Sequence, residues 1–226
     1  MANHSFIWPI VTALVTLAGC SSSALETAYR RQSIDTLDRY FQTWHESIVP
    51  ISDEELIHAE EVEQATYAVY EQTFSPFDYP SIGGDSLTAM KYRYVVIQGT
   101  VPYIIVDSSS LKMIRKGSVD HFRPRVPRIK GITIPLTPEH ESELNAFLDR
   151  GEERVSFLQH YMYVLHQHWG KGWHIATPPV ITRLQFNQTF LSARVWFRVG
   201  YEFGQASLTK QGGLWILSNA EIDAIE

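Results

Sequence analysis

Four histidines lie close together in the second half of the chain, where they could bind a metal ion. They are His160, His166, His168 and His174. A helical zinc pair needs histidines four residues apart, as in His-Glu-x-x-His, because only then do both rings project from one face. His166 and His168 are two residues apart, so on a helix they would project about 200° from each other. Since no cysteine or close carboxylate completes a ligand set, we expect histidines on a helix surface, without a metal or a cofactor.

Motifs of hydrolases and of phosphate-binding enzymes are absent from the sequence. There is no Gly-x-Ser-x-Gly, no glycine loop that could cradle a phosphate, and no Ser/His/Asp order that suggests hydrolysis. The formal net charge is −6. Because nucleic-acid binding depends on neutralising phosphates with lysine and arginine, this charge argues against a nucleic-acid partner.

A short basic run is the exception to this acidic composition. It consists of Arg115, Lys116, Arg123, Arg125, Arg128 and Lys130. Such a run could meet an anionic partner, for example lipid headgroups or lipopolysaccharide. We favour the simpler interpretation, in which a solvated loop pairs with nearby acidic side chains.

Cys20 is the only cysteine, so the chain forms no internal disulfide. Its thiol is a potential nucleophile, and it comes after an apolar run over residues 6–17. That run is shorter than the roughly 20 residues a membrane-spanning helix needs, but it has the length of the hydrophobic region of a signal peptide.

The sequence Leu17-Ala18-Gly19-Cys20 resembles a lipobox, the cleavage pattern of bacterial lipoprotein signal peptides. The segment before the apolar run departs from that pattern, because it contains no lysine or arginine. The resemblance implies cleavage before Cys20 and attachment of three acyl chains, such as palmitate, which anchor a protein stably. Ser21, rather than Asp, is the next residue after the cysteine, which implies the outer membrane where one exists. The alternative is a buried amino-terminal helix with a chance cysteine.

Apolar side chains recur at steps of three and four in several segments, which predicts amphipathic helices. Ser33 caps a first helix that ends near Ile48. Ser52 and Glu55 form a capping box for a second helix that runs to about Phe74. Two further helices are expected, one that Thr137 caps and Gly151 ends, and one over residues 152–169.

Strand-like segments rich in Val, Ile and aromatic residues occur in the middle and at the end of the chain. We expect strands over residues 91–98 and 101–107, and then an irregular stretch over 108–131. Three antiparallel strands are expected at the end of the chain, over 179–186, 192–209 and 214–220. Gly200 and Gly204 are the expected bends in the long middle strand.

Helices that precede a long antiparallel meander predict an α+β fold. We expect amino-terminal helices packed on a curved antiparallel sheet, with a helical insertion between the early and late strands. The predicted organisation is a signal peptide over 1–19, a lipidated tether over 20–32 and a single domain over 33–226, with an insertion at 108–172.

The ending VITRLQFNQTFLSARVWFRVGYEFGQASLTKQGGLWILSNAEIDAIE resembles the nuclear-transport-factor-2-like superfamily, also called SnoaL-like or cystatin-like. The resemblance covers about half of the chain and implies a cone-shaped fold whose open end can hold a small molecule. Four side chains on the early helices could face that cone. They are Asp38, Tyr40, Tyr67 and Tyr70.

These observations support two classes of function, and a third, a lipoprotein chaperone or assembly factor, would need a long exposed groove. The first is a membrane-anchored envelope lipoprotein whose domain binds a small ligand or an envelope protein without catalysis. The second is a SnoaL-like isomerase or dehydratase, with an Asp or His as general base and a Tyr as oxyanion donor. A carboxylate or histidine with a raised pKa beside a tyrosine in a deep pocket would favour the enzyme.

Overall fold

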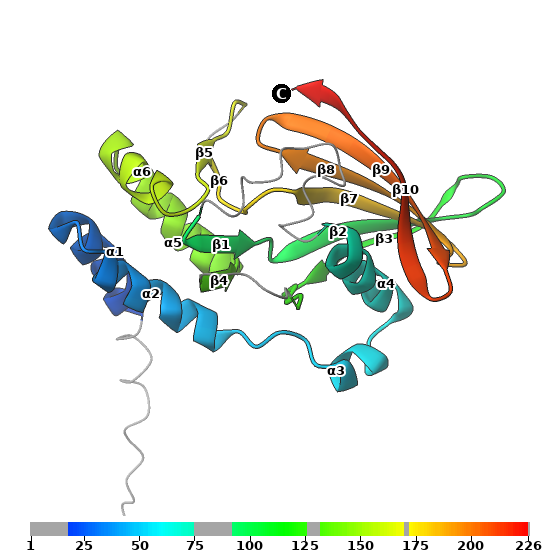
Figure 1. The fold of residues 1–226 in the computed structure, drawn as a ribbon, viewed down its shortest axis with the longest axis horizontal. Helices are drawn as coiled ribbons and strands as arrows, with labels where there is room; N and C mark the ends of the chain where they lie inside the picture. Colours follow the sequence, from blue (N-terminus) through cyan, green and yellow to red (C-terminus); the bar gives the residue numbers. More distant parts are fainter. Residues whose placement is uncertain (1–17, 75–91, 126–131, 170–171, 226) are drawn as a thin grey trace, which may run out of the picture.

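The computed structural model describes residues 18–74, 92–125, 132–169 and 172–225. Four helices gather at one end of the molecule and form a helical body (Figure 1). They are α1 (Ala18–Arg31), α2 (Ile34–Ser47), α5 (Pro138–Leu148) and α6 (Glu152–Gln159). The predicted caps of two of these helices are confirmed. The hydroxyls of Ser33 and Thr137 each accept a hydrogen bond from the backbone N–H of the third residue after them.

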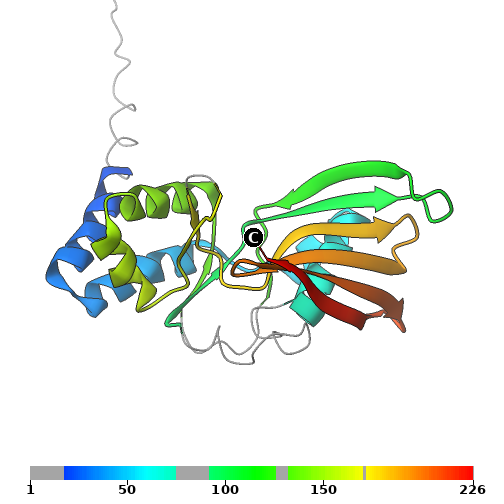
Figure 2. The same ribbon diagram turned by 90° about the horizontal axis from the view of Figure 1, so that it is seen from above.

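A six-stranded sheet forms the other end of the molecule (Figure 2). Its strands, in spatial order, are β10 (Leu214–Ile225), β9 (Glu202–Gln211), β8 (Ser192–Val199), β7 (Val180–Asn187), β2 (Thr100–Val106) and β3 (Met113–Asp120). Neighbouring strands are antiparallel except β2 and β7, which are parallel. The α+β class, with early helices and a late sheet, is therefore confirmed, and the sheet is mixed.

Two short helices and a π-helical turn cover one face of this sheet. They are α3 (Asp53–His58), α4 (Glu61–Val69) and η1 (Tyr70–Phe74). Val62, Val69 and Tyr70 pack there against inward-facing strand residues such as Val195 and Phe197, and together they form a sheet core. The predicted capping box at Ser52 and Glu55 is confirmed, but the predicted single helix to Phe74 breaks at Ala59.

A second, helical core lies between the helices of the helical body. The two cores meet at β1 (Tyr94–Ile97), which pairs in parallel with β4 (Ile132–Pro135) in a separate small sheet. Tyr94 and Val96 face the helical core, whereas Val95 and Ile97 face the sheet core. Because successive side chains of a strand point to opposite sides, this fully buried strand joins both cores into one folded unit.

The segment expected to be a tether, 20–32, lies within α1 and the turn after it. Leu25 and Ala28 on this helix are buried in the helical core. The carboxylate of Glu26 lies within 3.0 Å of Arg154, and Arg30 and Arg150 also pair with it. Its hydrogen bonds with Arg154 and Arg30 lower the pKa of Glu26 to about 2. The folded domain therefore begins before Ser33.

Three local predictions differ from the structure. The stretch 108–131 was expected to be irregular, yet β3 occupies its middle and pairs with β2. The helix predicted over 152–169 ends at Gln159, and the chain then forms β5 (Leu165–His166) and β6 (Trp173–His174). The long strand predicted over 192–209 folds back at Gly200, whose φ of 64° suits a tight turn between β8 and β9.

Candidate functional site

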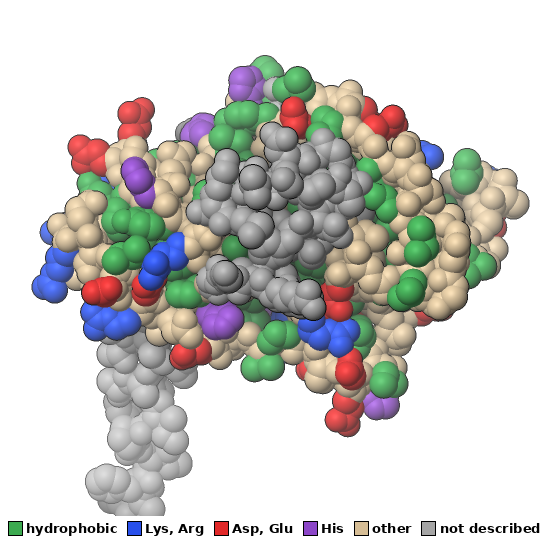
Figure 3. Space-filling model, in the orientation of Figure 1, with side chains coloured by type: hydrophobic (Ala, Val, Ile, Leu, Met, Phe, Trp, Pro, Cys, Tyr) green, Lys and Arg blue, Asp and Glu red, His purple; other side chains and the backbone are tan. Residues whose placement is uncertain are grey.

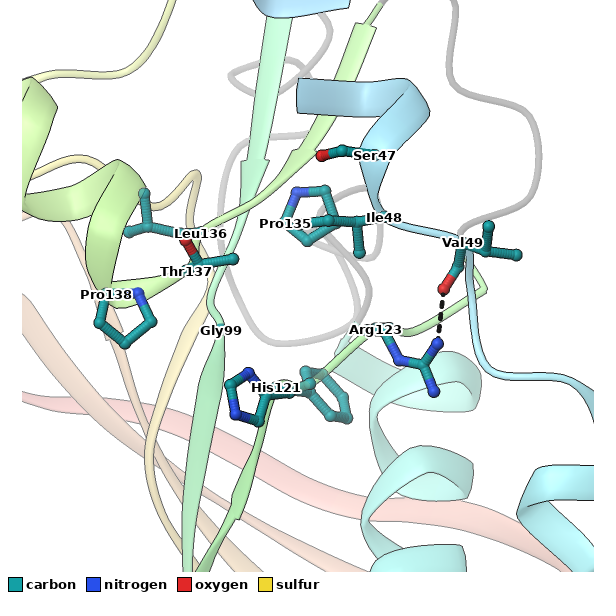
Figure 4. Close-up of a pocket in the computed structure, with 11 residues that line it drawn as sticks. Ser47, Ile48, Val49, Gly99, His121, Arg123, Pro135, Leu136, Thr137 and Pro138 are labelled. Atoms are coloured by element: carbon teal, nitrogen blue, oxygen red, sulfur yellow. Dashed lines mark hydrogen bonds between the residues drawn. The ribbon is translucent and has the colours of Figure 1, made fainter. Parts of the chain in front are cut away.

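A pocket of about 300 Å³ opens where the helical body meets the sheet, and we call it the waist pocket. The ends of α2, β1, β3 and β4 converge there (Figure 4). The described residues that line it are Ser47, Ile48, Val49, Gly99, His121, Phe122, Arg123, Pro135, Leu136, Thr137 and Pro138. These segments are far apart in sequence, so the pocket exists only when both cores are formed.

Gly99 allows two backbones to approach each other at the wall of this pocket. A Cβ atom at this position would lie 1.7 Å from the carbonyl oxygen of Leu136. The same two segments are joined by a hydrogen bond in which the backbone N–H of Leu136 donates to Ile97, at 2.8 Å. Only a residue without a side chain fits this contact, so Gly99 fixes the shape of the waist pocket.

Arg123 supplies a positive charge that neighbouring groups hold in place. Its guanidinium donates to the carbonyl of Val49 at 3.0 Å and to the carboxylate of Glu55 at 2.9 Å. A hydrogen bond from the backbone N–H of Ser52, and a second from Arg123, lower the pKa of Glu55 to about 2, so this carboxylate is ionised at neutral pH. The backbone N–H of Arg123 also donates to the Tyr67 hydroxyl at 3.1 Å.

The remaining lining of the waist pocket is mostly apolar or already hydrogen-bonded. The Ser47 hydroxyl donates to the carbonyl of Trp44, and the Thr137 hydroxyl caps α5. None of the described lining side chains is acidic. His121 and Arg123 are therefore the polar groups that a ligand in this pocket would meet, beside proline and aliphatic walls.

A second pocket, of about 420 Å³, borders the same junction and shares Gly99, Leu136 and Pro138 with the first. Gln98 in its wall is buried, and its side-chain amide is hydrogen-bonded at both ends. The amide oxygen accepts from the backbone N–H of Ile181 at 2.7 Å, and the amide nitrogen donates to the carbonyl of Thr100 at 2.9 Å. This amide therefore ties the end of β1 to β7 and holds the junction between the two pockets.

The structure does not bring the four predicted pocket residues together. Asp38 forms a two-pronged ion pair with Arg93 and also accepts from the Tyr94 hydroxyl at 2.6 Å. The Arg93 guanidinium is the main reason that the pKa of Asp38 is lowered. Tyr40, on the same helix, is buried in the helical core, and burial raises its pKa.

Tyr67 and Tyr70 lie instead in the sheet core, where both rings pack against Phe122. Burial raises the pKa of both hydroxyls. Tyr67 is connected to the waist pocket through two lining residues, because its ring packs on Phe122 and its hydroxyl accepts from the backbone N–H of Arg123. The four residues thus lie in two separate places. Asp38 and Tyr40 are on α2, beside the helical core, whereas Tyr67 and Tyr70 are in the sheet core.

The prediction that the four histidines lie on a helix surface is wrong for three of them, which lie beyond the end of α6. His160 caps the end of α6, His166 and His174 lie on β5 and β6, and His168 lies between those strands. Among the described residues, no group of histidine, aspartate or glutamate side chains could hold a metal ion.

Three arginines of the basic run pair with acidic residues. Arg115 lies 2.7 Å from Glu60, and Arg123 lies 2.9 Å from Glu55. Arg125 contacts both Asp53 and Glu71. These pairs agree with the interpretation in which the run pairs with nearby acidic side chains, and each of the three arginines has an acidic partner. Arg128 and Lys130 lie outside the described residues.

The waist pocket was not predicted from the sequence. The glycine between the apolar segments 91–98 and 101–107 was the one available signal, but it was interpreted as the joint between two strands. A glycine is equally consistent with a turn and with a close backbone contact, so it does not identify a pocket by itself.

Within the described residues, no helix is long and apolar enough to cross a lipid bilayer. Comparisons of the chain with protein-family models, with curated proteins and with solved structures give no significant match.

Proposed function

We propose that the protein is a lipid-anchored lipoprotein of the bacterial cell envelope whose domain binds a small ligand or an envelope protein without catalysis. The observation that carries the binding role is the waist pocket, with its apolar walls, one fixed arginine and no acidic described lining residue. An anion with an apolar part, or a peptide side chain of that kind, would match this lining.

The anchoring role rests on Leu17-Ala18-Gly19-Cys20 and on the place of the cysteine in the fold. Cys20 lies in the first turns of α1, and Leu25 on the same helix is buried in the helical core. Acyl chains on Cys20 would therefore hold the folded domain close to the membrane, in the outer membrane where one exists.

The enzyme alternative gains little support from the described side chains. Asp38 is the only carboxylate that the superfamily resemblance selects, and it is held ionised by Arg93. A general base working near neutral pH needs a pKa close to that pH, whereas the pKa of Asp38 is lowered. The relationship to the nuclear-transport-factor-2-like superfamily is likewise a proposal, supported by the hairpins over β7–β10.

The anchor is tested by replacing Cys20 with serine. In cells fed a radioactive fatty acid, the Cys20→Ser variant should carry no acyl label and should keep its first 19 residues, because a serine hydroxyl is not the nucleophile that accepts the diacylglycerol. Ser21→Ala is the matched control and should be labelled normally. Acyl label on the Cys20→Ser variant would overturn the anchor.

The binding role is tested by filling the waist pocket. Figure 4 shows Ile48 pointing into the pocket and Val49 pointing away from it. Titration with anilinonaphthalene sulfonate, an anion with an apolar ring system, should show saturable fluorescence. In Ile48→Trp the affinity should fall about tenfold or more, which corresponds to the loss of ~1.4 kcal/mol of contact.

Val49→Trp adds the same indole on the neighbouring residue and should leave the affinity nearly unchanged. Equal binding by both variants would show that the probe does not occupy the waist pocket. Equal loss in both would point to a general effect on the fold, and either result would remove the support for this site.

A further inference from the structure

Three hairpin ends lie side by side at the end of the sheet farthest from the helical body (Figures 1 and 2). They are the turns between β2 and β3, between β7 and β8, and between β9 and β10. Backbone hydrogen bonds connect them, since Gln188 donates to Val106 at 3.0 Å and Lys210 donates to Leu191 at 2.9 Å. We call these joined hairpin ends the tip surface.

Aliphatic side chains concentrate on the tip surface. Six of the ten large apolar side chains that are exposed in the described part of the chain lie here. They are Leu111, Met113, Ile114, Leu191, Leu214 and Ile216. Hydrophobic side chains are visible at this end of the molecule in Figure 3. Single exposed aliphatics are ordinary, but a concentration of them on adjoining loops marks an interaction surface.

The longest of the three turns is held in shape by its own hydrogen bonds. One carboxylate oxygen of Asp107 accepts from the backbone N–H groups of Ser109 and Ser110, at 3.0 and 2.7 Å. It also accepts from both serine hydroxyls, and these bonds lower the pKa of Asp107. Leu111 comes next with φ of 55°, a backbone region that a bulky side chain rarely adopts. The turn thus presents Leu111 to solvent, 72% exposed, in a fixed conformation.

The charges around these side chains are mainly positive, although the whole chain is acidic. Lys112 and Lys116 lie on the hairpin of β2 and β3, Lys210 lies on the hairpin of β9 and β10, and Asp107 is the acidic residue of the three turns. Arg115 is also present but pairs with Glu60. The tip surface is therefore complementary to a negatively charged partner.

The composition of the tip surface favours lipid over protein as that partner. The cores of protein–protein interfaces are enriched in aromatic residues and arginine and depleted in lysine. Here the aromatic residues of the hairpin ends, Phe190 and Trp215, are buried, and the exposed residues are aliphatics beside lysines. Aliphatic side chains that enter the headgroup boundary, beside lysines attracted to anionic headgroups, are the pattern of interfacial membrane binding.

We propose that the tip surface docks on a bilayer that contains anionic lipids, with the aliphatic side chains of the three hairpins entering the headgroup boundary. The tip surface and α1 lie at opposite ends of the molecule (Figures 1 and 2). This contact is therefore separate from the anchor at Cys20 and does not depend on it.

The test places an environment-sensitive fluorophore on the tip surface of the full chain. With Cys20→Ser in the background, Leu111→Cys provides one labelling site. Ile57→Cys on α3 is the matched control, because both parent side chains are 72% exposed. When phosphatidylglycerol–phosphatidylcholine vesicles are added, the fluorescence emission of the label at 111 should shift to the blue, and quenchers attached to the lipids should reduce its intensity. The label at 57 should not respond, and neither should respond to phosphatidylcholine alone.

The lysines give an independent, graded measurement. Lys112→Gln or Lys210→Gln should each lower the vesicle partition coefficient reported by the label at 111 about fivefold, because each removes one charge near the surface. The proposal is overturned if the label at 111 is silent, if the label at 57 responds equally, or if neutral vesicles act as well. A blue shift that depends on protein concentration without vesicles would also overturn it, and would identify a second copy of the chain as the partner.

Discussion

Replacing Gly99 with alanine is expected to lower the free energy of unfolding by about 3 kcal/mol or more. The added Cβ would lie 1.7 Å from the carbonyl oxygen of Leu136 and 2.8 Å from its carbonyl carbon. Both are backbone atoms, so the clash is relieved only when one of the two segments moves. Such a movement breaks the hydrogen bond between Leu136 and Ile97 and opens the wall of the waist pocket. Urea unfolding monitored by tryptophan fluorescence measures the loss.

Gly117→Ala is the matched control for this experiment. A Cβ there would lie 2.7 Å from the Tyr103 hydroxyl oxygen and 2.8 Å from the ring carbon that bears it, so a side chain, rather than a backbone segment, would have to shift. Its cost should therefore be clearly smaller than that of Gly99→Ala. Equal costs for the two variants would mean that the backbone contact at Gly99 is not tight in solution, and that the waist pocket lacks a fixed wall.

Local signals in the sequence predicted the elements that depend on local contacts. The caps at Ser33, Ser52 and Thr137 identified the starts of three helices, because each cap is a contact between residues three apart. The segments of β7, β8 and β10 were predicted from alternating apolar residues and from the turn residues between them. On β8, Val195 and Phe197 are buried, as the alternation requires. The α+β class was predicted from the order of these elements.

The predictions that differ from the structure concern segments whose conformation depends on contacts outside the segment itself. Seven of the eight residues of β3 are exposed, so the strand has no alternating apolar pattern and is held mainly by pairing with β2. The segment after Gln159 has apolar residues at helical spacing, but Met162 is buried in the helical core and bridges to Tyr94. A tertiary contact thus overrides a local helical pattern there.

The candidate site depends even more on long-range contacts. Asp38 was selected because it lies on an early helix, but its ionisation is controlled by Arg93, which lies 55 residues away. The waist pocket combines the ends of α2, β1, β3 and β4. A periodic pattern says which face of an element is buried, but not which other element covers it, so the pocket could not be assembled from the sequence alone.

The second large effect is expected for Leu25→Ala in α1. Leu25 is 1% exposed and lies in the helical core, so truncation removes buried contacts and leaves a cavity. The free energy of unfolding should fall by about 3 kcal/mol. The measurement is urea unfolding of the Cys20→Ser chain with and without the substitution, compared at the same detergent concentration.

Leu214→Ala, at a leucine that is 58% exposed, is the matched control and should change the free energy of unfolding by no more than about 0.5 kcal/mol. If Leu25→Ala were equally mild, α1 would not be packed in solution, and the segment 20–32 would be a tether as the sequence suggested. If the loss is large, α1 belongs to the domain.

Leu25 lies five residues after Cys20 in the same helix, so about 8 Å of helix would separate the acylated residue from the helical core. A lipid at that position would fix the domain against the membrane by its helical end, so the bilayer on which we propose that the tip surface docks would be a second one.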